Sequence, residues 1–364
     1  MNRILLCAVL AWALLVGSGS AARAAQTDSA AAMDTQRFEF VSGGKRLVGF
    51  IDLPAGRPAR AMVVIVHGYG ATDVAGRTSY HDLRSLFTRL GIATVVWDKP
   101  GCGDSEGEFD INQPVESSAE EVIDAARQLR DSRLPGAERI GLWGISRAGW
   151  IAPLAITRDP GIAFWISVSG TDALENFPYL LESNLPIEGR SAGETERLVD
   201  EWRRGFEITS RGGTFEDYMA ATENLRNDPF MALFGGGAAV DESAFTIEQR
   251  RFSSGAFTVD PGTGLMVYVP AFAERLSRVN VPVLALFGEK DRNVNWRSTA
   301  ALYARTIGRN PRARLTIRTF PDGNHNLHRA ETGGLREMLT MAGHQPAEGY
   351  HEAMTDWLRE TVLN

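Results

Sequence analysis

The sequence predicts an α/β protein with a doubly wound, mainly parallel sheet and helices on both of its faces. Short continuous runs of β-branched and apolar residues, such as AMVVIV at Ala61–Val66, are typical of buried parallel strands. These runs alternate with segments of helical apolar spacing, and strands joined by helices pair in parallel with right-handed crossovers. At the centre of this alternation, a serine lies between a strand and a helix in a turn of small residues.

The first predicted elements form a hairpin. Two short strands, Arg37–Val41 and Arg46–Leu53, are joined by Ser42-Gly43-Gly44-Lys45, which is a turn signal. The elements that follow are the strand Ala61–Val66, the helix Tyr80–Leu90, the strand Ile92–Trp97, the helix Val115–Asp131, the strand Arg139–Trp143, the helix Trp150–Thr157 and the strand Phe164–Ser169.

The alternation stops after Gly170 and resumes near residue 280. Residues 171–279 contain helical stretches, Glu194–Ile208 and Thr214–Arg226, with glycine-rich connectors, and they predict an inserted helical cap. The predicted core therefore consists of residues 37–170 and 280–364. Its second part contains the strand Val281–Gly288, the helix Trp296–Ile307, the strand Arg314–Phe320 and the amphipathic helix Tyr350–Val362.

The N-terminus has the pattern of a secretory signal peptide over residues 1–24. Arg3 is followed by the apolar run Ile4–Val16 and by Ala22-Arg23-Ala24, a small-x-small cleavage site. The apolar run is too short for a permanent membrane anchor, so no stable membrane insertion is expected. Residues 25–36 predict a flexible leader, and the expected location is the periplasm or the medium.

Composition narrows the class of partner. The chain is 44% hydrophobic and 23% charged, which are ordinary values for a globular protein. Removal of residues 1–24 takes away two arginines and no acid, so the formal charge changes from −7 to −9. An acidic chain without a basic run argues against nucleic acid as a partner. Only Cys102 remains after cleavage, which excludes an intramolecular disulfide, and the oligomeric state stays open.

Ser146 is the predicted nucleophile. It lies in the turn Gly144-Ile145-Ser146-Arg147-Ala148, between a strand and a helix that begins near Trp150. Such a turn needs small residues two positions before and after the serine, because strand and helix nearly collide there. Alanine at position 148 adds one methyl group, and Gly149 follows it.

A serine hydroxyl needs a base and an orienting carboxylate to act as a nucleophile at neutral pH. His325 and His328 are the candidate bases, in the sequence NHNLH after the last strand. The candidate acids are Glu289 and Asp291, after the strand VPVLALFG, and Asp322. The two histidines lack a third ligand at a suitable spacing, so neither a metal nor another cofactor is predicted.

Five segments together resemble the capped α/β-hydrolases of the serine-aminopeptidase-like and bacterial esterase group. They are HGYG from His67, DKPGCGDSEG from Asp98, GISRAGWIAP from Gly144, VPVLALFGEKD from Val281 and DGNHN from Asp322. The resemblance spans nearly all of the chain outside residues 171–279 and departs from the family pattern at Pro100 and Ala148. It implies an eight-stranded sheet and the hydrolysis of an ester or amide through an acyl-enzyme.

The resemblance also implies roles for individual residues. Ser146, Asp291 and His325 match the family's order of nucleophile, acid and base. The backbone N–H groups of Tyr69 and Arg147 match its oxyanion donors. Trp150, just past the serine, is expected to border the substrate, and His67 to hold a loop.

The leading functional prediction is a cofactor-independent carboxylic ester hydrolase that acts on a small molecule. An aminopeptidase of the same fold is an alternative, because cap acids such as Glu182, Glu188 and Glu194 could bind a free amino group. A non-catalytic binding protein on the same scaffold is the alternative from another class. Dehalogenase and epoxide chemistry are disfavoured, because those relatives carry aspartate in place of the serine.

Overall fold

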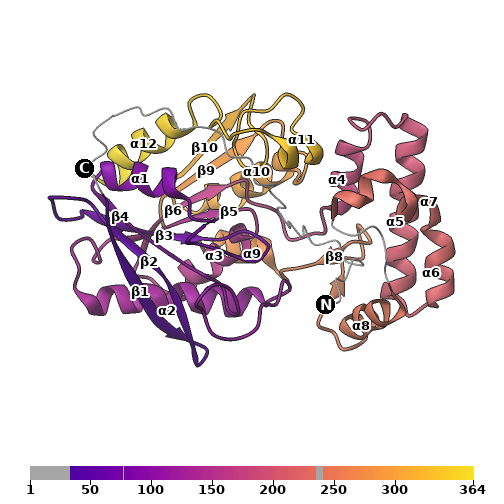
Figure 1. Cartoon of the computed structure of the whole chain (residues 1–364), viewed down its shortest axis with the longest axis horizontal. Helices are drawn as coiled ribbons and strands as arrows, with labels where there is room; N and C mark the ends of the chain where they lie inside the picture. The colour runs from indigo at the N-terminus through magenta and orange to yellow at the C-terminus, as the bar shows by residue number, and fades with distance from the viewer. Residues whose placement is uncertain (1–32, 77, 235–240) are drawn as a thin grey trace.

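The computed structural model describes residues 33–76, 78–234 and 241–364. Its centre is an eight-stranded sheet with the strand order β1-β2-β4-β3-β5-β6-β9-β10 (Figure 1). The strands are β1 (Asp34–Ser42), β2 (Lys45–Leu53), β3 (Ala61–Val66), β4 (Ile92–Trp97), β5 (Ile140–Ile145), β6 (Ile162–Val168), β9 (Val283–Gly288) and β10 (Leu315–Phe320). The predicted signal peptide and the first part of the predicted leader lie outside the described residues.

The sheet confirms the predicted α/β-hydrolase architecture. Strands β4, β3, β5, β6, β9 and β10 pair in parallel, whereas β1 with β2 and β2 with β4 pair in antiparallel. The six parallel strands therefore end at one edge of the sheet. That edge is where loops from distant parts of the chain meet.

The flexible leader was predicted to extend to residue 36, and this boundary is wrong. Strand β1 begins at Asp34, which pairs with Leu53, and the hydroxyl of Thr35 donates to Asp52 at 2.6 Å. The residues Asp34–Gln36 are polar because they lie on an exposed edge strand, and this polarity made them resemble a leader.

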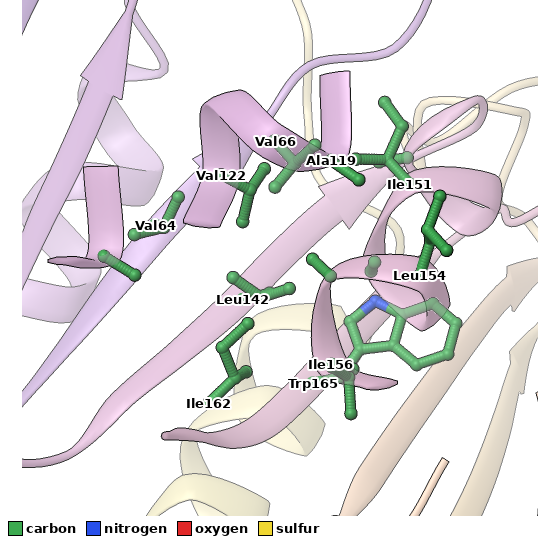
Figure 2. Close-up of a cluster of buried hydrophobic side chains, with 14 of the residues drawn as sticks. Val64, Val66, Ala119, Val122, Leu142, Ile151, Leu154, Ile156, Ile162 and Trp165 are labelled. Atoms are coloured by element: carbon green, nitrogen blue, oxygen red, sulfur yellow. The ribbon is translucent and has the colours of Figure 1, made fainter. Parts of the chain in front are cut away.

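Helices cover both faces of the sheet. One face packs against α2 (Val115–Ser132), α3 (Ala148–Arg158), α9 (Phe272–Ser277) and α10 (Trp296–Arg305), and the other against α1 (His81–Arg89) and α12 (Tyr350–Thr361). Figure 2 shows part of the first interface, where Val64 and Leu142 of the strands lie near Val122 of α2. These side chains are almost completely buried, as their apolar sequence runs predict.

The segment between β6 and β9 is mostly helical, and Figure 1 shows α4 to α8 gathered beyond one end of the sheet. The helices are α4 (Phe177–Asn184), α5 (Ala192–Ser210), α6 (Phe215–Ala221), α7 (Glu223–Asn227) and α8 (Glu242–Ser253), and two turns of 3₁₀ helix follow α7 at Pro229–Phe234. Five of its aromatic residues are buried together in a separate apolar cluster: Phe177, Trp202, Phe206, Phe230 and Phe234.

This segment also contains features that the sequence pattern did not predict. A small antiparallel pair, β7 (Thr258–Val259) and β8 (Met266–Val267), lies within it, and its strands are too short to show an alternating pattern.

Outside this segment, the helix α11 (Leu335–Thr340), near the C-terminus, was not predicted either. Within the described residues, no helix has both the length and the apolar character that a membrane span requires.

Candidate active site

Ser146 occupies a strained turn at the end of β5. Its φ of 56° lies in the left-handed region, which costs a residue with a Cβ about 1–2 kcal/mol. The Ser146 N–H donates to the carbonyl of Val168 at 2.9 Å, and its carbonyl accepts from Gly149 at 2.8 Å. These bonds hold the residue where strand turns into helix α3, and the side chain lines a small pocket. A buried serine in a sharp turn between a strand and a helix, with its side chain at a pocket, is the geometry of a nucleophile elbow.

The collision that the motif predicts is present between Gly144 and Ala148. A Cβ on Gly144 would lie 2.5 Å from the Cβ of Ala148, much closer than two carbons approach. Ala148 is completely buried at the first turn of α3. The extra methyl of Ala148 is therefore tolerated because position 144 has no side chain.

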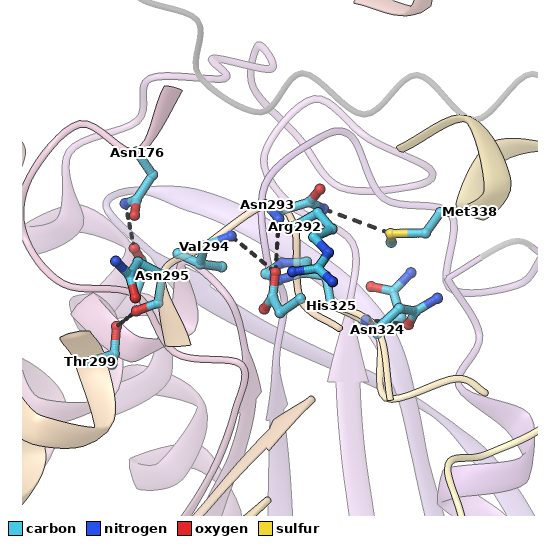
Figure 3. A network of polar contacts seen from close by, with 12 residues as sticks. Asn176, Arg292, Asn293, Val294, Asn295, Thr299, Asn324, His325 and Met338 are labelled. Atoms are coloured by element: carbon cyan, nitrogen blue, oxygen red, sulfur yellow. Dashed lines mark hydrogen bonds and ion pairs between the residues drawn. The ribbon is translucent and has the colours of Figure 1, made fainter. Parts of the chain in front are cut away.

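Asp291 and His325 form a buried hydrogen-bonded pair. The His325 Nδ1 lies 2.8 Å from Oδ2 of Asp291, and the two side chains are 5% and 0% exposed. The other carboxylate oxygen accepts from the backbone N–H groups of Asn293 and Val294, both at 2.9 Å (Figure 3). The carboxylate is thus fixed as an acceptor for Nδ1–H, which leaves Nε2 of the ring as the proton-accepting nitrogen.

The rival acids have other partners. Glu289 accepts from the hydroxyl of Thr319, and Asp322 accepts from Arg329 at the surface. Asp291, the acid that the family resemblance implies, is therefore the one of the three candidates that binds His325.

His328, the rival base, stacks on His344 with ring centroids 4.7 Å apart. Burial and the neighbouring histidines lower its pKa to about 4. It is not among the residues that line the pocket of Ser146. The described residues contain no group of three His, Cys, Asp or Glu side chains that could hold a metal ion.

Ser146 and the Asp291–His325 pair lie at the same edge of the sheet, at the ends of β5, β9 and β10. Asn293, whose N–H binds the Asp291 carboxylate, also lines the pocket of Ser146. Among the described residues, however, no hydrogen bond joins the Ser146 hydroxyl to the His325 ring. The described residues therefore show Asp291 and His325 as a hydrogen-bonded pair, and Ser146 at the same sheet edge without a hydrogen bond to that pair.

Two backbone segments lie beside Ser146. A Cβ on Gly68 would be 3.5 Å from the Cβ of Ser146, so the loop after β3 runs past the serine, and Tyr69 lines the same pocket. Arg147 is the N-cap residue of α3, and the first N–H groups of a helix have no partner within the helix. The predicted oxyanion donors are thus on the two segments that flank the serine.

His67, at the start of this loop, holds it in place. Its Nε2 lies 2.7 Å from the carbonyl of Trp97 and its Nδ1 3.3 Å from the hydroxyl of Tyr80. Burial, with a contribution from Lys99, lowers its pKa to about 3, so the ring stays neutral. These contacts agree with the loop-holding role expected from the sequence.

The pocket is small and has an aromatic wall. Its volume is about 20 Å³, enough for a single water, so a substrate needs side chains to move before it can enter. Trp150 lines it, stacks on Tyr268 at 4.8 Å and donates its ring N–H to the carbonyl of Asp172 at 2.6 Å. The lining residues are Tyr69, Ser146, Trp150, Thr171, Glu175, Asn176, Phe177, Leu180, Tyr268 and Asn293.

Glu175 is a pocket residue that the sequence analysis missed. Its carboxyl accepts from the hydroxyl of Tyr268 at 2.6 Å and from the N–H of Phe177 at 2.8 Å. Burial raises its pKa to about 7, although the hydrogen bonds favour the ionised form. No motif surrounds it, and its place in the pocket depends on a contact with a residue 93 positions away.

The cap acids proposed from the sequence do not line this pocket. Glu182 is exposed beside Arg203, Glu188 pairs with Arg336, and Glu194 caps the N-terminus of α5 through Ser191. Acidity and a place in the helical segment are all that the sequence shows of these residues, and sequence position alone does not show which face of a helix points to the site.

Comparison with known proteins agrees with the fold. The sequence model of the alpha/beta hydrolase family matches residues 63–334, which is more than half of the chain. The chain therefore belongs to the alpha/beta hydrolase family. A search of the curated proteins found no match.

Solved structures share the fold. An α/β-hydrolase from Penicillium sp. sh18, GrgF, has a TM-score of 0.52 at 16% identity, over 91% of this chain and 99% of its own. An esterase from Pyrococcus furiosus has a TM-score of 0.51 at 14% identity, over 90% and 92% of the two chains. Est1E from Butyrivibrio proteoclasticus, with ferulic acid bound, has a TM-score of 0.50 at 14% identity, over 90% and 100%. At these identities the similarity shows the fold alone.

Proposed function

We propose that this hydrolase cleaves carboxylic esters of small molecules, with Ser146 as nucleophile, His325 as base and Asp291 as orienting acid. The observation that carries the proposal is the buried Asp291–His325 pair at the same sheet edge as a serine with a φ of 56°. No cofactor takes part in this chemistry.

In the proposed reaction, Oγ of Ser146 attacks the ester carbonyl while Nε2 of His325 takes its proton. The N–H groups of Tyr69 and Arg147 bind the oxyanion of the tetrahedral intermediate. Collapse of the intermediate breaks the bond to the alcohol, which leaves with the proton from His325. Water then attacks the acyl-enzyme by the same steps and releases the acid and the free serine.

The reaction requires the His325 ring to come within about 2.6–3.2 Å of the Ser146 hydroxyl. The described part of the chain has no hydrogen bond between the Ser146 hydroxyl and the His325 ring. This is compatible with the requirement, because catalytic hydrogen bonds in unliganded enzymes often shorten only when substrate binds. His325 follows β10 on a loop, whereas Ser146 is held by strand and helix, so we expect the loop to make the adjustment.

The test is turnover of short p-nitrophenyl esters by the wild type and Ser146→Ala. The variant should lose at least about 10³-fold in kcat, because the nucleophile is absent. Ser169→Ala is the matched control: Ser169 directly follows the neighbouring strand β6, is also buried with a positive φ, and lies outside the pocket. Equal rates for wild type and Ser146→Ala would eliminate the mechanism. Failure of a fluorophosphonate probe to label Ser146 would favour a binding protein instead.

A second candidate function is the cleavage of amides that carry a free amino group, and Glu175 favours it. A carboxyl among Trp150, Tyr268 and Phe177 could bind an ammonium group through charge and aromatic faces. Aminoacyl p-nitroanilides should then be better substrates than plain acyl esters, and Glu175→Gln should remove that preference. The absence of any aminoacyl preference would count against this candidate.

The helical segment between β6 and β9 supplies Glu175, Asn176, Phe177, Leu180 and Tyr268 to the pocket. We therefore propose that it acts as a cap that selects the substrate. Export to the periplasm or the medium is a further part of the proposal, on the pattern of residues 1–24. N-terminal sequencing of the cell-derived protein should begin at Ala25, and a chain that keeps Met1 would contradict cleavage.

A further inference from the structure

Lys99 connects two loops next to the candidate site. It follows β4, and its partly buried ammonium donates to the carbonyl oxygens of Gly68 at 2.6 Å and Gly70 at 2.8 Å. Its own backbone N–H donates to the hydroxyl of Thr72 at 2.8 Å. One residue therefore binds three points of the loop that contains Tyr69.

The hydrogen bond from the Lys99 ammonium to the Gly68 carbonyl determines the direction of the Tyr69 N–H. No cis peptide bond occurs in the described residues, so the Gly68–Tyr69 peptide is trans and planar. In a trans peptide the C=O and the following N–H point in opposite directions. With the Gly68 carbonyl directed at the ammonium of Lys99, the N–H of Tyr69 is directed away from it. Gly68 lies against Ser146, and Tyr69 lines the pocket of Ser146.

We propose that Lys99 is a positioning residue for catalysis, which orients and polarises the Gly68–Tyr69 peptide so that the Tyr69 N–H binds the oxyanion. This inference rests on the proposed esterase function. Hydrogen bonds from a charged donor are roughly twice as strong as neutral ones. A cation on the carbonyl also withdraws charge from the peptide and makes its N–H a better donor. The ammonium thus stabilises the oxyanion without touching the substrate.

The surroundings of Lys99 make its charge sensitive to pH. Burial is the main reason that its pKa falls to about 7, and the positive charge of Arg147 lowers it further. Glu121 of α2 and Cys102 of the same loop act in the opposite direction, and the buried, neutral His67 lies close by. Below about pH 7 the ammonium polarises the peptide, and above it an uncharged amine remains in its place.

The main test replaces Lys99 with methionine, which has a similar length and no charge. Lys99→Met should lower kcat for a p-nitrophenyl ester by about 10- to 100-fold and leave KM nearly unchanged, because oxyanion binding acts on the transition state. The control is Lys45→Met, an exposed lysine at the start of β2, which should keep wild-type kinetics. Circular dichroism and thermal melting confirm that each variant is folded.

The pH profile separates positioning from mere support of the loop. In the wild type, kcat/KM should fall on the alkaline side as Lys99 loses its proton. Lys99→Met should lack this alkaline limb, and Lys99→Arg, whose guanidinium stays charged, should shift the limb to higher pH. A loop that is only loosened would lower the rate at every pH and keep the shape of the profile.

A folded Lys99→Met with kcat within two-fold of the wild type overturns the proposal. An alkaline limb that is the same in the wild type and in both Lys99 variants also overturns it. If Lys99→Met does not fold, the comparison of wild type with Lys99→Arg still decides. Full activity of Ser146→Ala would instead contradict the proposed function itself, so the two failures are distinguishable.

Discussion

The turn at Ser146 allows a prediction of activity and stability from a single distance. In Gly144→Ala, the new methyl would lie 2.5 Å from the Cβ of Ala148, against the 3.5–4.0 Å or so at which carbons normally pack. One of the two residues must move by about 1 Å, and Ser146 lies between them. Overpacking of a dense core costs about 1–3 kcal/mol. A shift of 1 Å in a catalytic group can cost about 10²-fold in rate.

The double variant Gly144→Ala/Ala148→Gly is the decisive comparison. The other neighbours of a Cβ on Gly144 are atoms of Val66 at 3.4 and 3.6 Å, which are ordinary contacts. Removal of the Ala148 methyl should therefore relieve the clash. Ala148→Gly alone should destabilise the protein by about 1 kcal/mol, because glycine is unfavourable in a helix.

The assay combines urea unfolding with ester turnover for the wild type, the two single variants and the double variant. We expect the double variant to be more stable and more active than Gly144→Ala, although each single change is harmful. This coupling of at least about 1 kcal/mol should appear in a double-mutant cycle. If the two losses simply add, the steric explanation of the Gly-x-Ser-x-Ala turn is refuted.

Two further predictions concern buried charge. Arg84 binds both carboxylate oxygens of the fully buried Asp52, so Arg84→Met should reduce the free energy of unfolding by about 3–5 kcal/mol. Arg127→Met, which breaks a more exposed pair with Asp124, should cost less than about 1 kcal/mol, and equal losses in urea unfolding would contradict the role of burial. Burial raises the pKa of Glu175 from 4.5 to about 7, so between these values the folded state binds more protons than the unfolded state. Stability should therefore fall by up to about 3 kcal/mol as pH rises through this window in the wild type but not in Glu175→Gln, and parallel pH curves for the two proteins would disprove this.

The order of strands and helices was predictable because it depends on local sequence patterns. Continuous apolar runs predicted β3 and β4 with the observed bounds, and the small-residue turn predicted the position of Ser146. The apolar pattern of the sequence did not predict short strands, such as β7 and β8, or the polar start of the edge strand β1.

The sequence by itself determined the sheet, the turn at Ser146 and a short set of candidate acids and bases, because strand alternation and turn sterics act between near neighbours. Only the tertiary structure shows the hydrogen bond between His325 and Asp291, the acid that the family resemblance implied. It also brought Glu175 into the pocket and placed Lys99 against the carbonyl of Gly68. Each of these contacts joins loops from different strands, and the distance between two loops depends on how the whole sheet and its helices pack.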